Sequence, residues 1–180
     1  MINGIINVYK ERGFTSFDVV AKLRGILHER KIGHTGTLDP EATGVLPVCI
    51  GNATKVCELL TDKDKVYRTV MHLGITTDTQ DMTGTVKEDR SREAALLKEQ
   101  TVEAAILQFV GDYEQIPPMY SALKVNGKKL YELARQGIEI ERAARKITIH
   151  ALHINEMKLA DDEKTVTFTV ECSKGTYIRT

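Results

Sequence analysis

Hydrophobic and polar positions recur along this chain in patterns that predict much of its secondary structure. Residues 4–10 (GIINVYK) and 45–51 (VLPVCIG) are short apolar runs bounded by turn-forming residues, which predicts buried strands. Residues 15–30 carry apolar side chains at helical spacing, and either Thr15 or Ser16 can cap the helix that this spacing predicts. A strand, a helix and a second strand are therefore expected in the first third of the chain.

The rest of the chain mixes alternating and helical patterns. Residues 65–75 alternate, so Tyr67 and every second residue up to Ile75 should share one face of a strand. Residues 146–159 and 165–173 alternate in the same way, as antiparallel strands do. Because no regular strand–helix–strand rhythm is present, we predict a mixed α+β fold with a largely antiparallel sheet flanked by helices.

Two further helices are expected in the second half. One begins at a Thr101 cap and stops at Gly111. The other follows a Pro-Pro break, begins after a turn at Asn126-Gly127 and ends at Gly137.

Composition narrows the setting in which the chain works. Of 180 residues, 42% are hydrophobic and 28% are charged, with a formal net charge of zero, so a folded domain is expected rather than a disordered one. No apolar run is long enough to span a bilayer, and no secretory signal precedes the first strand. Cys49, Cys57 and Cys172 lack CxxC spacing, so we expect reduced, buried thiols. Together with the short apolar runs and the missing secretory signal, this predicts no membrane association and a cytoplasmic location.

The zero net charge hides a separation of charge along the chain. Residues 120–146 contain seven basic and three acidic residues, whereas residues 76–114 contain nine acidic and four basic residues. The basic stretch is either an ordinary solvated surface or a surface that contacts phosphates, with Tyr120 and Tyr131 available for stacking on bases.

The loop at residues 33–44, GHTGTLDPEATG, is the strongest candidate for chemistry. Asp39-Pro40 is either a simple turn or a nucleophilic carboxylate held by a stiff proline among flexible glycines. The glycines fit neither a P-loop nor a dinucleotide fingerprint. His150 and His153 form an HxxH pattern, but alternation puts them on opposite faces of a strand, so no metal site is expected.

The loop closely resembles the catalytic motif of the TruB family of tRNA pseudouridine synthases. Four other segments resemble family motifs in the same order: NGIINVYKERGFTSFDVV, DKVYRTVMHLGITTDTQDMTG, QIPPMYSALKVNGKKLYELARQG and KGTYIRT. Together they cover essentially the whole chain. The resemblance implies a pseudouridine synthase fold and an enzyme that isomerises uridine 55 in the T-loop of tRNA, without a cofactor or a metal.

The resemblance also implies roles for individual residues. Asp39 would be the catalytic aspartate, with Arg179 paired to it. Tyr67 would stack on the uracil, and Tyr177 would line the pocket. Further site residues follow from the same motifs: His34 would fill the gap left by the flipped nucleotide, Asp81 would touch the RNA, and Lys124, Lys128 and Lys129 would bind RNA. The expected partner is the T-stem-loop of tRNA, with no obligate protein partner.

One departure from the family concerns length. Family chains continue beyond the GTYIRT motif, so residues 1–180 are expected to be a catalytic domain that is incomplete at its C-terminus, without the family's PUA-like RNA-binding domain. Three alternatives stay open at this point: a tRNA-binding module without catalysis, a synthase that uses a guide RNA, and a carboxylate-based glycoside hydrolase. Release of tritium from RNA labelled at uridine C5 identifies a synthase, and RNA binding without release identifies a binding module.

Overall fold

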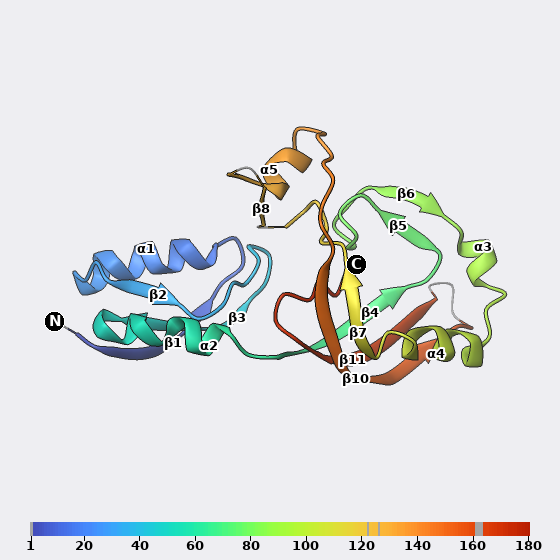
Figure 1. The fold of residues 1–180 in the computed structure, drawn as a ribbon, viewed down its shortest axis with the longest axis horizontal. Coiled ribbons are helices and arrows are strands. Elements are labelled where there is room, and N and C mark those ends of the chain that lie inside the picture. Colours follow the sequence, from blue (N-terminus) through green and yellow to red (C-terminus); the bar gives the residue numbers. More distant parts are fainter. Residues whose placement is uncertain (1, 122, 126, 161–163) are drawn as a thin grey trace. The chain divides into compact units, whose positions relative to one another are not determined.

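The structure is a computed structural model that describes residues 2–121, 123–125, 127–160 and 164–180 (Figure 1). The chain divides into two compact units, Met1–Lys63 and Asp64–Thr180. Strands in both units pair antiparallel, and helices accompany them. The predicted α+β class is confirmed.

The first unit is a three-stranded sheet in the order β1-β3-β2, with helices beside it. Its elements are β1 (Gly4–Lys10), α1 (Ser16–Leu27), β2 (Ile32–His34), β3 (Gly44–Ile50), the 3-10 helix η1 (Gly51–Val56) and α2 (Cys57–Thr61). The predicted helix cap is confirmed at Thr15, whose hydroxyl accepts from the Asp18 N–H at 3.0 Å while the Asp18 carboxylate accepts from the Thr15 N–H at 2.8 Å. This capping box satisfies two donors that helix formation leaves unpaired.

The core of the first unit lies between α1 and one face of the sheet. Its buried members are Val19, Val20, Ile32, Leu46, Val48 and Ile50. The prediction that residues 4–10 form a buried strand is right about the strand and wrong about its burial. β1 is an edge strand, and the side chains of Ile5 and Tyr9 point away from the α1 face and stay exposed.

The second unit is built on a four-stranded antiparallel sheet in the order β4-β11-β10-β7, with two short two-stranded sheets, β5-β6 and β8-β9 (Figure 1). Its elements are β4 (Lys65–His72), β5 (Ile75–Thr77), β6 (Val86–Asp89), α3 (Ser91–Ala94), α4 (Glu99–Leu107), β7 (Gly111–Gln115), β8 (Lys124–Val125), β9 (Lys128–Lys129), α5 (Leu130–Ala134), β10 (Arg145–Lys158) and β11 (Thr165–Cys172).

One face of this sheet carries the core of the second unit. Strand β11 supplies Val166, Phe168, Val170 and Cys172, which alternate and so share that face. Helix α4 packs on the Val166 end through apolar side chains, whereas Ile178 packs on the Val170 end. The C-terminal residues are therefore held against the sheet that carries Tyr67.

Two predicted boundaries in this unit are wrong. The strand expected over residues 65–75 ends at His72, because Gly74 adopts a φ of +87° and its carbonyl accepts from the Arg90 N–H, so Ile75 starts β5 in a separate sheet. Thr101 does not cap α4. The helix begins two residues earlier, and the Lys98 carbonyl accepts from the N–H groups of Thr101 and Val102.

The helix stop at Gly111 is also misplaced. Helix α4 ends at Leu107, and Gly111 is instead the first residue of β7, a strand that the pattern did not predict. Of the predicted Asn126-Gly127 turn, Asn126 lies outside the described residues, while Gly127 has a φ of +80° between β8 and β9. The following helix, α5, ends at Ala134, close to the predicted stop at Gly137.

All three cysteines are free thiols. Cys49 and Cys172 are buried as predicted, whereas Cys57 is only half-buried. Burial raises the pKa of the Cys49 thiol to about 11 and also raises that of Cys172. Within the described ranges, no helix is both long and apolar enough to cross a bilayer.

Candidate active site

Asp39 lies in the loop between β2 and β3, and this loop is anchored by a buried lysine. Lys10 ends β1 with its side chain wholly buried (0% exposed). Its ammonium donates to three carbonyl groups, those of Phe14 at 2.7 Å, Glu11 at 3.0 Å and Pro40 at 3.2 Å. The Pro40 carbonyl also accepts from the Gly13 N–H at 2.9 Å. The backbone immediately after Asp39 is thereby fixed to β1.

The backbone before Asp39 is anchored from α1. Ser16 is 2% exposed, and its hydroxyl accepts from the Leu38 N–H at 2.9 Å and donates to the Leu38 carbonyl at 3.2 Å. Asp39 itself is exposed, and its carboxylate forms no hydrogen bond with the residues that the structure describes. The loop thus presents the Asp39 carboxylate from a backbone that is held on both sides.

His34 is the last residue of β2, where it pairs with Val48 of β3. Its Nδ1 atom is buried and has no hydrogen-bond partner among the described residues. Because a buried polar nitrogen without a partner is costly, this atom is a candidate for contact with a bound ligand or a water molecule.

Tyr67 in β4 is directly opposite Val170 of β11, so the two side chains share the core face of the sheet. Thr69 and Met71 follow on the same face, as the alternation predicted. Tyr67 is 40% exposed, and Ile178 packs beside Val170. The ring of Tyr67 is therefore on the sheet face to which the Tyr177–Arg179 segment is held.

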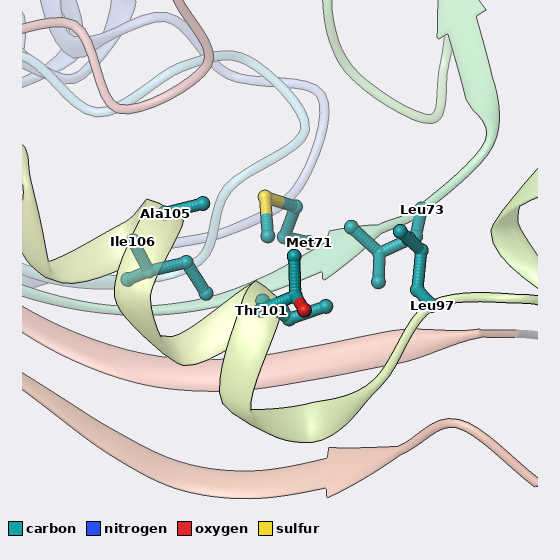
Figure 2. A pocket seen from close by; sticks show the side chains of 7 residues that line it. Met71, Leu73, Leu97, Thr101, Ala105 and Ile106 are labelled. Carbon is teal, nitrogen blue, oxygen red and sulfur yellow. The ribbon is translucent and has the colours of Figure 1, made fainter.

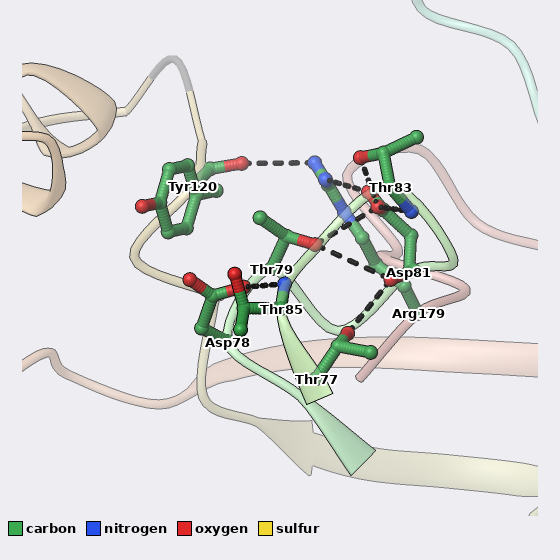
Figure 3. Close-up of polar contacts among 8 residues, drawn as sticks. All are labelled: Thr77, Asp78, Thr79, Asp81, Thr83, Thr85, Tyr120 and Arg179. Carbon is green, nitrogen blue, oxygen red and sulfur yellow. Dashed lines mark hydrogen bonds and ion pairs between the residues drawn. The ribbon is translucent and has the colours of Figure 1, made fainter. Parts of the chain in front are cut away.

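Asp81 and Arg179 form an ion pair across 98 residues of sequence, as Figure 3 shows. Arg179 Nη1 donates to Asp81 at 3.1 Å, and Nη2 donates to the Tyr120 carbonyl at 2.8 Å. Thr79 and Thr83 also donate to the Asp81 carboxylate (Figure 3). The guanidinium is thus held in one orientation by two different segments.

Two opposing effects set the pKa of Asp81. Partial burial raises the pKa of this carboxyl, but hydrogen bonds from two threonines and Arg179 together outweigh burial. The pKa therefore lies below its ordinary value, and Asp81 is a carboxylate at neutral pH.

Tyr177 is held through its backbone. Its N–H and its carbonyl are both bonded to the side chain of Gln115, each at 2.9 Å. The neighbouring Ile178 packs in the core, so the segment is held at two adjacent residues.

The three lysines predicted to bind RNA lie together on the β8–β9 hairpin. Lys124 is paired with Lys129, and Lys128 is paired with Val125. The Lys129 ammonium donates to the Tyr131 hydroxyl at 3.2 Å, and both Lys129 and Arg135 lie over the Tyr131 ring. Lys124 and Lys129 thus share one face of the hairpin, with the Tyr131 ring beside Lys129, and Lys128 lies on the other face. Basic side chains beside an aromatic ring suit contact with phosphates and bases.

An apolar pocket of about 160 Å³ lies between α4 and β4 (Figure 2). Its lining residues are Met71, Leu73, Leu97, Thr101, Val102, Ala105 and Ile106. No ionisable side chain lines it, so this pocket is a gap in the packing of α4 and not the candidate active site. Among the described residues, no group of three or more His, Cys, Asp or Glu side chains is arranged to hold a metal ion.

The predicted site residues fall into two sets. Asp39 and His34 belong to the first unit, whereas Tyr67, Asp81, Tyr177 and Arg179 belong to the second. Within the second unit, the structure links Arg179 to Asp81 and holds Tyr177 two residues away. The pairing of Arg179 with Asp39 stays a prediction.

The sequence analysis missed three residues that support the site: Lys10, Ser16 and Gln115. For Lys10 a usable pattern exists, because Ile6, Val8 and Lys10 are two residues apart and Val8 faces the core. A lysine at an inward position of a strand indicates a buried charge with a specific task. No comparable pattern marks Ser16 or Gln115.

The chain has the pseudouridine synthase fold. It aligns over 97% of its length with 41% of a chain in the crystal structure of a Cbf5–Nop10–Gar1 complex, with a TM-score of 0.63 and 29% identity. It also aligns over 97% with 39% of a chain in the structure of an H/ACA RNP bound to a substrate RNA containing 2′-deoxyuridine, with a TM-score of 0.60 and 26% identity.

Sequence comparison then places the chain within this class. Residues 24–178 match the profile of "TruB family pseudouridylate synthase (N terminal domain)", so the chain belongs to the TruB family. Proteins named tRNA pseudouridine synthase B are similar to it throughout: 62% identity in Lachnoclostridium phytofermentans, over 99% of this chain and 58% of the relative, and 53% in Bacillus pumilus, over 100% and 58%. The chain therefore spans about 58% of the length of these relatives.

Proposed function

We propose that this chain is the catalytic domain of an enzyme that isomerises uridine to pseudouridine in the T-stem-loop of tRNA, at position 55. The observation that carries the proposal is the position of Asp39 within the family motif, on a loop fixed by Lys10 on one side and Ser16 on the other. The names of the relatives supply the proposed substrate. A tRNA substrate also favours the cytoplasm as the place of action.

The reaction needs few chemical groups. The bond from uracil N1 to ribose C1′ breaks, the base turns, a bond from C5 to C1′ forms, and the proton on C5 leaves while N1 gains one. Atoms and electrons balance within the substrate, so the chemistry requires no external oxidant, reductant or group donor. Asp39 would act by attack at C1′, by attack at C6, or by removal of the ribose 2′ proton.

The other residues have roles that follow from their chemistry. The ring of Tyr67 offers a flat apolar surface that retains the detached uracil and allows it to rotate in its plane. The target nucleotide has to leave the folded loop before its glycosidic bond is accessible. His34, with its unpartnered Nδ1, would contact the RNA where the nucleotide has left.

Binding of the RNA would rest mainly on phosphates. The β8–β9 hairpin presents Lys124, Lys128 and Lys129 beside the Tyr131 ring. Folded RNA is recognised largely by shape and backbone contacts, so a local basic surface is sufficient on a chain with no net charge.

The test is release of tritium from a T-stem-loop RNA labelled at uridine C5. We expect turnover by the intact protein and none by the Asp39→Asn variant, whose affinity for the RNA in filter binding should stay within a few fold. Glu41→Gln is a matched control, because Glu41 is an exposed acid in the same loop whose ion-pair partner among the described residues is the exposed Arg12, at 3.4 Å. Clear turnover by Asp39→Asn, or RNA binding without tritium release by the wild type, contradicts the proposal.

A further inference from the structure

Gln115 joins two segments that are far apart in sequence. It is the last residue of β7 and is 5% exposed. Its Nε2 donates to the Tyr177 carbonyl at 2.9 Å, and its Oε1 accepts from the Tyr177 N–H at 2.9 Å. The side-chain amide therefore pairs with a backbone residue as an opposing strand residue does, 62 positions away in the chain.

At neutral pH the carboxamide of glutamine satisfies both partners. The Tyr177 backbone presents one donor and one acceptor, and a carboxamide presents one of each in the complementary order. A carboxylate has no donor for the Tyr177 carbonyl, and a hydrocarbon side chain has neither group. The two backbone groups also fix which side-chain atom is nitrogen and which is oxygen.

The contact lies next to the candidate site residues of the second unit. Ile178 packs in the core, and the neighbouring Arg179 guanidinium donates to Asp81 and to the Tyr120 carbonyl. The segment that starts at Gln115 runs through the buried Pro117 and Pro118 to Tyr120, whose carbonyl accepts from Arg179. Gln115 and Tyr120 thus hold the two ends of the Tyr177–Arg179 segment, and the prolines keep the distance between them fixed.

We infer that Gln115 is a positioning residue, whose carboxamide fixes the Tyr177–Arg179 segment and so keeps Tyr177 and Arg179 in the positions that the proposed reaction requires. The inference rests on the proposed function. It assigns Gln115 no contact with substrate. The pairing requires an uncharged side chain that both donates and accepts. Replacing Gln115 by glutamate should therefore make kcat depend on pH in a way that the wild type does not.

The decisive variant is Gln115→Glu in the intact protein, compared with Gln115→Met and with Gln100→Glu, which adds the same charge at an exposed position of α4. At pH 8 the introduced carboxylate repels the Tyr177 carbonyl, and kcat for tritium release should fall at least about tenfold, since small displacements of reacting groups are costly. Affinity for the RNA should change less than about twofold, because phosphate contacts are untouched.

Lowering the pH should rescue one variant only. Burial raises the pKa of an introduced carboxyl group, so protonation near pH 6 restores the missing donor. The ratio of wild-type kcat to Gln115→Glu kcat should shrink from pH 8 to pH 6, whereas the same ratio for Gln115→Met should not. Wild-type kcat for Gln115→Glu at pH 8, or a deficit that does not vary with pH, overturns the inference.

Hydrogen exchange provides a measurement that does not depend on the variants. The Tyr177 N–H should exchange slowly in the wild-type protein, and rapid exchange overturns the inference even if neither variant folds. If the wild type releases no tritium, the proposed function fails, while the exchange of the Tyr177 N–H still decides whether Gln115 holds this segment.

Discussion

Replacing Ser16 by alanine tests whether the anchoring of the Asp39 loop matters for catalysis. The change removes the acceptor of the Leu38 N–H and the donor to the Leu38 carbonyl, at 2.9 and 3.2 Å. Leaving a part-buried donor unsatisfied costs about 1–3 kcal/mol. If about 1.4 kcal/mol of this is lost from the active conformation of the loop, kcat should fall about tenfold.

Thr15→Ala is a matched control for this effect. It removes the neighbouring hydroxyl, which caps α1 by accepting from the Asp18 N–H, at a cost of about 1 kcal/mol. Urea unfolding should show comparable destabilisation for the two variants, whereas tritium release should fall only for Ser16→Ala. Equal kcat values for the two variants would refute the reasoning, because stability alone would then explain both.

Three further predictions concern the second unit. Tyr67→Leu should lower kcat for tritium release more than Tyr67→Phe, because the ring retains the free base; equal rates for Leu and wild type would exclude stacking. Asp81→Asn should be less stable than wild type in urea at pH 7, and the difference should shrink toward pH 3. A carboxyl with a lowered pKa stabilises the fold above its unfolded pKa and loses that effect as it protonates, so a difference that does not vary with pH contradicts the lowered pKa of Asp81. Replacing Lys124 and Lys128 together by glutamine should weaken RNA binding at low salt and reduce the slope of log K against log salt by about 2, whereas an unchanged slope would show that these lysines do not contact phosphates.

Local patterns in the sequence determined the features that depend on neighbouring residues. The Thr15 cap, the apolar run of β3 and the alternation of β11 were predicted correctly, because each follows from interactions within a few residues. The alternation predicted for β10 is wrong in part, because register shifts after Ile149 and after Ile154 change which residues face the core, so the placing of His150 and His153 on opposite faces does not follow from it. The motif around Asp39 is also a run of neighbouring residues, so its resemblance to the family could be recognised in the sequence. Errors occurred at ends of elements: Thr101 and Gly111 looked like the start and stop of a helix, but the helix actually starts at Glu99 and ends at Leu107.

Tertiary structure alone decided which residues support the site. Lys10 reaches Pro40, Gln115 reaches Tyr177, and Asp81 reaches Arg179, over separations of 30, 62 and 98 residues. These contacts depend on which strands are neighbours, and the order β4-β11-β10-β7 is not contained in any local pattern. A hydrogen bond requires its two groups within about 3 Å of each other in a suitable orientation. Sequence periodicity fixes the face on which a side chain lies, but only the folded sheet fixes what that side chain meets.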